Sequence, residues 1–133
     1  MFSEYDDYLK LDFLVDYWYD EGIDIASKII SKFEENAWDE LLANCSLRTT
    51  QWKIRCAETL DLTAHPTSVL VLLRLLDSSD KEVMLAAADT LRDKNVEKIP
   101  LRVVVELQAL SEKGSPPVKA IIGNILEKLD IRQ

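Results

Sequence analysis

Four aspartates recur at four-residue intervals near the N-terminus, and three consecutive aromatic residues lie between them. The seven residues are Asp12, Asp16, Asp20 and Asp24 with Tyr17, Trp18 and Tyr19. On a continuous helix these carboxylates would form an acidic stripe, at a cost of roughly 0.2–0.5 kcal/mol per like-charged pair. Carboxylates steer a basic partner into place, and aromatic side chains anchor protein interfaces. The pattern therefore predicts a surface that binds a basic protein.

The same segment has a second interpretation, in which its aromatic residues only cover the open end of a helical stack. The inward face of such a helix would consist of Leu11, Leu14, Val15 and Trp18. The acidic residues would still face outward. Gly22 would end this helix in a variant of the scheme, so that Asp24 begins another and the stripe shortens to three. Covering alone, and covering combined with binding, both stay open at this point.

Residue types that perform catalysis or bind metals are few and isolated. His65 is the only histidine, whereas a catalytic triad or a zinc site needs companions beside it. Cys45 and Cys56 lack Cys-x-x-Cys spacing, and the three glycines do not form a phosphate-binding loop. We therefore expect no catalytic residue, no metal, no cofactor and no small-molecule substrate.

Charge is distributed unevenly along the 133 residues, whose net charge is -8. Residues 1–24 contain eight of the 24 acids and one of the 16 bases, a net charge of -7, which leaves 16 acids and 15 bases for the rest. This excess argues against nucleic acid and anionic membranes as partners and favours a basic protein. The acidic start is unlike a signal peptide, so we expect a cytoplasmic protein with free thiols.

Apolar residues beyond residue 24 recur at three- and four-residue steps, which predicts consecutive helices. The predicted ranges are 25–42, 49–60, 66–76, 79–91, 100–110 and 115–129. The helix over 66–76 is apolar nearly all round and should lie in the middle of the structure. Ser79 and Glu82 have capping-box spacing. Two β-branched runs, 69–71 and 103–105, continue with helical spacing, so a strand is rejected there.

Three of these helices align with one another as 52–60, 83–91 and 118–126. One column holds large apolar residues, namely Trp52, Val83 and Val118. A second column holds small residues, namely Ala57, Ala88 and Gly123. A third column holds leucines, namely Leu60, Leu91 and Leu126. A small residue allows a neighbouring helix to approach closely. The repeated column therefore predicts one packing contact repeated along a stack.

Residues 75–83, followed by two alanines and Leu91, resemble the turn and second helix of the HEAT-repeat family. Lys53 and Lys119 match a basic position of that family, whereas Met84 departs from it. The resemblance covers about residues 40–129. It implies one all-α domain over 1–133. Within this domain, residues 25–133 would form a right-handed α-solenoid of about three helical hairpins, and residues 1–24 would form an acidic N-terminal capping helix. Second helices line the concave side in this family, which adds a second candidate surface formed by Gln51, Arg55, Glu58 and Asp89.

A wider set of residues resembles the small HEAT-type immunity proteins of contact-dependent growth inhibition and related polymorphic toxin systems. The set is Phe33, Trp38, Leu41, Arg48, Trp52, Lys53, Ile54, Arg55, Ala57, Glu58 and Leu60. The resemblance implies that the chain binds the C-terminal domain of a cognate toxin, often a nuclease, and covers its basic surface. A general HEAT-repeat adaptor or assembly chaperone is the alternative, and a HEAT-type lyase or glycosylase is a third possibility.

Overall fold

Helices and their connections are the only structure in the part of the chain that the computed structural model describes, so the predicted all-α class holds there. The described residues are 1–94, 105, 108–109, 111–116, 119–120 and 122–124. The helices are α1 (Phe2–Leu9), α2 (Val15–Tyr17), α3 (Ile23–Ile30), α4 (Glu35–Asn44), α5 (Thr50–Thr59), α6 (Thr67–Leu76) and α7 (Lys81–Asp93). A π-helical turn, Trp18–Gly22, joins α2 to α3, and 3₁₀ turns, Cys45–Leu47 and Leu60–Leu62, follow α4 and α5.

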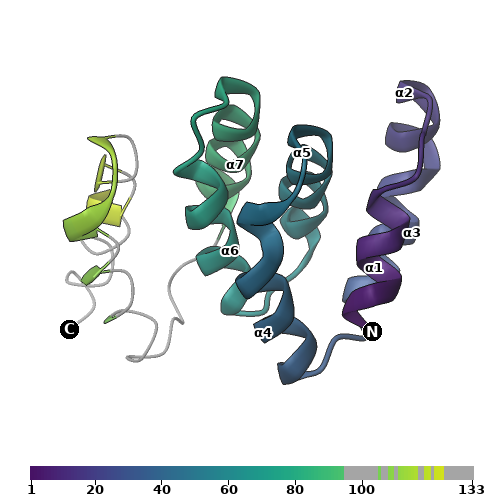
Figure 1. The fold of residues 1–133 in the computed structure, drawn as a ribbon, viewed down its shortest axis with the longest axis horizontal. Helices are drawn as coiled ribbons and strands as arrows, with labels where there is room; N and C mark the ends of the chain where they lie inside the picture. Colours follow the sequence, from purple (N-terminus) through teal and green to yellow (C-terminus); the bar gives the residue numbers. More distant parts are fainter. Residues whose placement is uncertain (95–104, 106–107, 110, 117–118, 121, 125–133) are drawn as a thin grey trace.

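The longer helices lie side by side in two rows (Figure 1). In one row α1 contacts α4 and α4 contacts α6, and in the other α3 contacts α5 and α5 contacts α7. The rows also contact each other, most extensively between α6 and α7 and between α1 and α3. Among the helices described, none is long and apolar enough to cross a membrane.

Helix α6 lies inside the molecule, as its uninterrupted apolar sequence predicts. Nine of its ten residues are buried, and the exception is Arg74. Arg74 turns outward and donates a 2.6 Å hydrogen bond from Nη1 to the carbonyl of Leu42. The run 69–71 is therefore helical, and the rejection of a strand there is confirmed.

Polar side chains cap the starts of α5 and α7. Thr49 caps α5, since its hydroxyl accepts a hydrogen bond from the Trp52 amide at 3.3 Å. Two predicted boundaries are wrong. The helix over 25–42 is interrupted at residues 31–34 and becomes α3 and α4. The cap of α7 is Asp80 rather than Ser79, because the Asp80 carboxylate accepts from the Glu82 amide at 2.9 Å.

Helices α5 and α7 pack against each other, but the buried small residue on α7 is not the one that the alignment predicts. Thr90 Oγ1 donates to the Ala57 carbonyl at 3.0 Å across the contact. Ala57 is fully buried, but its aligned partner Ala88 is only half-buried, and Ala87 takes the buried position. Gly123 is exposed, so it does not share this environment. The other two columns each have a third member outside the described residues, namely Val118 and Leu126. The same holds for most of the predicted helices 100–110 and 115–129.

Candidate protein-binding site

Residues 1–24, expected as one capping helix, form two helical segments in the structure. Helix α1 ends at Leu9, and a second helix begins at Val15 and continues through the π-helical turn to Ile30. Asp12 therefore lies in the connection and not on a helix. Gly22 does not end the helix, because its φ of -60° and ψ of -44° are helical. The stripe is therefore shortened to Asp16, Asp20 and Asp24, because the helix begins at Val15 and does not include Asp12.

The stripe lies on the face of α2–α3 that points away from the rest of the protein. The buried residues of this helix also recur at four-residue steps, as Trp18, Gly22, Ala26 and Ile30. The buried row is offset from the acidic row by two positions along the chain. On a helix of about 3.6 residues per turn, this offset corresponds to opposite faces. The row of aspartates is accordingly exposed along its whole length.

The three consecutive aromatic residues divide between the interior and the surface. Trp18 is 3% exposed, and its Nε1 donates to Glu58 Oε1 at 3.2 Å. Tyr19 is 58% exposed and lies near the same carboxylate, which raises the pKa of its hydroxyl through a hydrogen bond, with burial adding to the effect. Tyr17 is at the surface and stacks on Phe13 with ring centroids 5.2 Å apart. The two tyrosines are thus accessible to a partner, whereas Trp18 attaches the helix to α5.

The predicted inward face of this segment is wrong at three of its four residues. Leu14 and Val15 are 81% and 70% exposed, and Leu11 is also at the surface. Phe13 takes the inward position instead, where it lies against Tyr8 and Trp18. The change follows from the break between α1 and α2, which rotates this part of the chain out of a helical register.

Arg55, expected on an exposed concave surface, is 6% exposed and serves the fold. Its Nη1 donates to the carbonyls of Leu9 and Leu11 at 3.0 and 2.6 Å. Its guanidinium lies 4.8 Å from the centroid of the Phe13 ring. The three-residue spacing from the buried Trp52 was the sequence signal that Arg55 faces inward. Arg55 is therefore not available to a partner.

The remaining residues of the second candidate surface have different environments. Gln51 is exposed on α5, and Asp89 is exposed on α7. Glu58 is half-buried and hydrogen-bonded to Trp18. The structure thus brings Glu58 to the N-terminal helices and leaves Gln51 and Asp89 at the surface of the row that α5 and α7 share.

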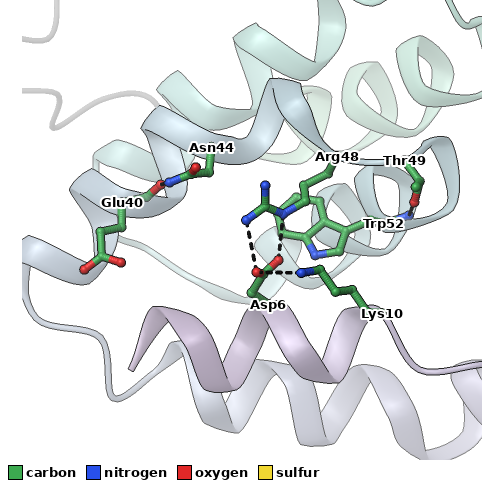
Figure 2. A network of polar contacts seen from close by, with 7 residues as sticks. All are labelled: Asp6, Lys10, Glu40, Asn44, Arg48, Thr49 and Trp52. Carbon is green, nitrogen blue, oxygen red and sulfur yellow. Dashed lines mark hydrogen bonds and ion pairs between the residues drawn. The ribbon is translucent and has the colours of Figure 1, made fainter.

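An ion pair that the sequence does not reveal holds α1 in place (Figure 2). Asp6 lies between Arg48, which donates two hydrogen bonds to its carboxylate, and Lys10, whose Nζ lies 3.1 Å away. Asp6 is 7% exposed, so this acid serves the fold. The other seven acids of residues 1–24 are exposed. The four-residue spacing of Asp6 and Lys10 suggests part of this network, but Arg48 joins it only through the fold.

The candidate nucleophiles and the histidine have structural environments. Both thiols are free and buried, and burial raises their pKa, so at neutral pH they are protonated and pack as small apolar groups. His65 stacks on Trp38 with centroids 4.6 Å apart and lies at hydrogen-bond distance from Glu35. No cluster of three or more potential metal ligands occurs among the residues described. Comparison of the whole chain with protein-family models, curated proteins and solved structures finds no match.

Proposed function

We propose that this chain is an immunity protein that binds and neutralises a basic toxin domain, often a nuclease, in the cytoplasm of the cell that makes the toxin. The observation that carries the proposal is the exposed aspartate row on α2–α3, which faces away from the buried row of the same helix. A row of like charges weakens a helix, so its presence favours a role in binding. Seven exposed acids in the first 24 residues would complement a basic cleft.

The architecture that we propose for this role is a right-handed α-solenoid of HEAT-like hairpins, with α1–α3 covering its N-terminal end. Contacts within each row, from α1 to α4 to α6 and from α3 to α5 to α7, support this arrangement. In a solenoid each hairpin contacts mainly its neighbours. Such a stack would hold the acidic row rigidly, so little conformational freedom would be lost on binding.

Electrostatic steering is the mechanism by which the acidic row would serve inhibition. Complementary charge raises association rates from about 10⁵–10⁶ to as much as 10⁸–10⁹ M⁻¹s⁻¹ at low salt. A rapidly formed complex would occlude the basic surface on which a nuclease binds its phosphate substrate. The exposed Tyr17 and Tyr19 would add contact area beside the charges.

The test uses the product of the gene immediately upstream of this one as the toxin. We expect co-expression of the chain to restore growth of cells that make this toxin, and deletion of the chain to have no effect when the toxin gene is absent. An adaptor would instead be needed without the toxin. Failure to protect the cells, or failure of the purified proteins to form a complex, would overturn the proposal.

The contribution of the acidic row is tested by association kinetics of the purified pair. The variant Asp16→Asn/Asp20→Asn/Asp24→Asn should associate about tenfold more slowly at low salt and depend less on salt. A matched control changes three other exposed aspartates, Asp39, Asp61 and Asp77, to asparagine and alters the net charge equally. Equal rates for the two triple variants would show that net charge alone acts, and would remove α2–α3 from the binding site.

A further inference from the structure

Three apolar side chains at the junction of α1 and α2 are left in water, and we call them the apolar cluster. They are Leu11, Leu14 and Val15, with exposures of 51%, 81% and 70%. Burial of apolar side chains stabilises proteins and complexes, and this fold leaves much of that surface uncovered. Exposed apolar residues that gather within a few positions and are bordered by polar ones are typical of interaction sites.

The conformation that exposes the apolar cluster is fixed from inside the protein. Arg55 donates hydrogen bonds to the carbonyls of Leu9 and Leu11, on the chain segment that enters the connection. Phe13 lies beneath the Arg55 guanidinium and is half-buried. Phe13 is turned inward there, whereas Leu14 and Val15 are exposed. The cluster is therefore presented by a buried contact, in the preorganised state that favours binding.

The charges around the apolar cluster select the chemistry of its occupant. Asp12 directly follows Leu11, Asp16 directly follows Val15, and both aspartates are exposed. A second copy of this chain would bring two segments of net charge -7 together, and an anionic lipid surface would be repelled for the same reason. A cationic segment that also has apolar side chains would pair with the aspartates and would cover the apolar cluster.

We propose that the apolar cluster, with Asp12 and Asp16, is the anchor that takes up a basic amphipathic segment of the protein partner. This rests on the proposed function for the basic character of that partner. The apolar contacts would provide affinity and residence time, while the aspartates would provide the rate of encounter. The inference thus adds an aliphatic centre to a site that the sequence describes by its aspartates and aromatic residues.

The test uses two synthetic peptides of equal length and charge with the full chain. One peptide has lysine and leucine at helical spacing, and the other has serine in place of each leucine. We expect the lysine–leucine peptide to bind at least about tenfold more tightly, because its leucines bury apolar surface on binding. A tenfold difference in affinity corresponds to about 1.4 kcal/mol of binding free energy. Its binding should shift the methyl resonances of Leu14 and Val15. Equal affinity of the peptides, or no binding of either, would overturn the inference.

Variants separate the apolar cluster from other exposed leucines and from the proposed function. Leu14→Ser/Val15→Ser should reduce affinity for the lysine–leucine peptide about tenfold, while Leu85→Ser, which changes a 63% exposed leucine on α7, should not. If the double variant neutralises the toxin with unchanged affinity, the anchor is wrong and the immunity role stands. If the chain gives no protection but the peptides are discriminated at Leu14 and Val15, the immunity role fails and the anchor stands.

Discussion

Arg48 donates two parallel hydrogen bonds to Asp6, from Nε to Oδ1 at 2.8 Å and from Nη2 to Oδ2 at 3.0 Å. The same guanidinium lies 5.8 Å from the centroid of the Phe2 ring and 5.7 Å from that of Trp52. Asp6 lies on α1, and Arg48 lies 42 residues further along the chain, shortly before α5. The ion pair therefore connects α1 to the start of α5. This contact, shown in Figure 2, fixes α1 against the rest of the protein.

We expect Asp6→Asn to lower the free energy of unfolding at neutral pH by about 2 kcal/mol, because Arg48 loses its charged, two-point acceptor in a part-buried site. Urea unfolding followed by circular dichroism measures the change. The control is Asp7→Asn, which alters the adjacent exposed acid and should change stability by less than about 0.5 kcal/mol. Equal effects of the two substitutions would contradict the structural role of Asp6.

The stabilisation by Asp6 should also depend on pH. Burial raises the pKa of its carboxyl, but hydrogen bonds from Arg48 and Lys10 outweigh burial and hold the pKa below its ordinary value. The folded-state pKa is therefore lower than the unfolded value of about 3.9. The contribution is complete well above that value and is lost as pH falls through the folded-state pKa. The stability difference between the natural chain and Asp6→Asn should thus shrink below about pH 4, and a difference constant to lower pH would refute this account.

Gly22 is required by the indole ring of Trp18. A Cβ added at Gly22 would lie 2.5 Å from Cε3 of Trp18, which is closer than real contacts allow. We expect Gly22→Ala to cost about 1–3 kcal/mol by displacing a packed ring, despite the better helix propensity of alanine. A shift of tryptophan fluorescence should accompany the loss. Gly123→Ala is the control, because a Cβ there meets nothing within 4 Å, and it should not destabilise the chain. Equal stability of the two variants would contradict the close contact.

Local sequence predicted the helices whose boundaries depend on local chemistry. Helices α5 and α6 lie within the ranges 49–60 and 66–76 that the apolar patterns predict. The split of 25–42 and the break after Leu9 were not predicted, and the chain after the second break contacts a residue that is distant in sequence. Arg55 donates to the carbonyls of Leu9 and Leu11 there, which are 46 and 44 residues away in sequence.

The candidate site was predictable to the same extent. Spacing alone identified the exposed aspartates of α2–α3, because a four-residue period persists through the π-helical turn. Spacing gave the opposite answer for Leu14 and Val15, because it assumed one helix through residues 11–18. Arg55 was misassigned because a charged residue was treated as a surface residue, whereas its apolar stem and backbone acceptors permit burial.

The packing between α5 and α7 should tolerate a larger side chain at Ala88 better than at Ala87. Ala87 is fully buried, whereas Ala88 is half-buried. We therefore expect Ala87→Leu to lower the free energy of unfolding by about 1–3 kcal/mol through overpacking, with a smaller loss for Ala88→Leu. Thermal unfolding of both variants measures the order. The reverse order would mean that the repeat alignment, in which Ala88 matches Ala57, describes the contact better than the structure does.

His65 should stabilise the start of α6 through one particular ring nitrogen. Its Nδ1 accepts a hydrogen bond from the Thr67 amide at 3.1 Å, so in the neutral ring Nε2 carries the proton and donates to Glu35 Oε1 at 2.9 Å. His65→Ala removes this cap and the stacking on Trp38, and should cost about 2 kcal/mol. His65→Asn restores a side-chain acceptor at the position of Nδ1 and should recover about 1 kcal/mol of that loss. His65→Gln, whose amide is one bond further from the backbone, should behave like alanine. Chemical denaturation of the three variants gives the order, and equal stability of the asparagine and alanine variants would show that the cap contributes nothing.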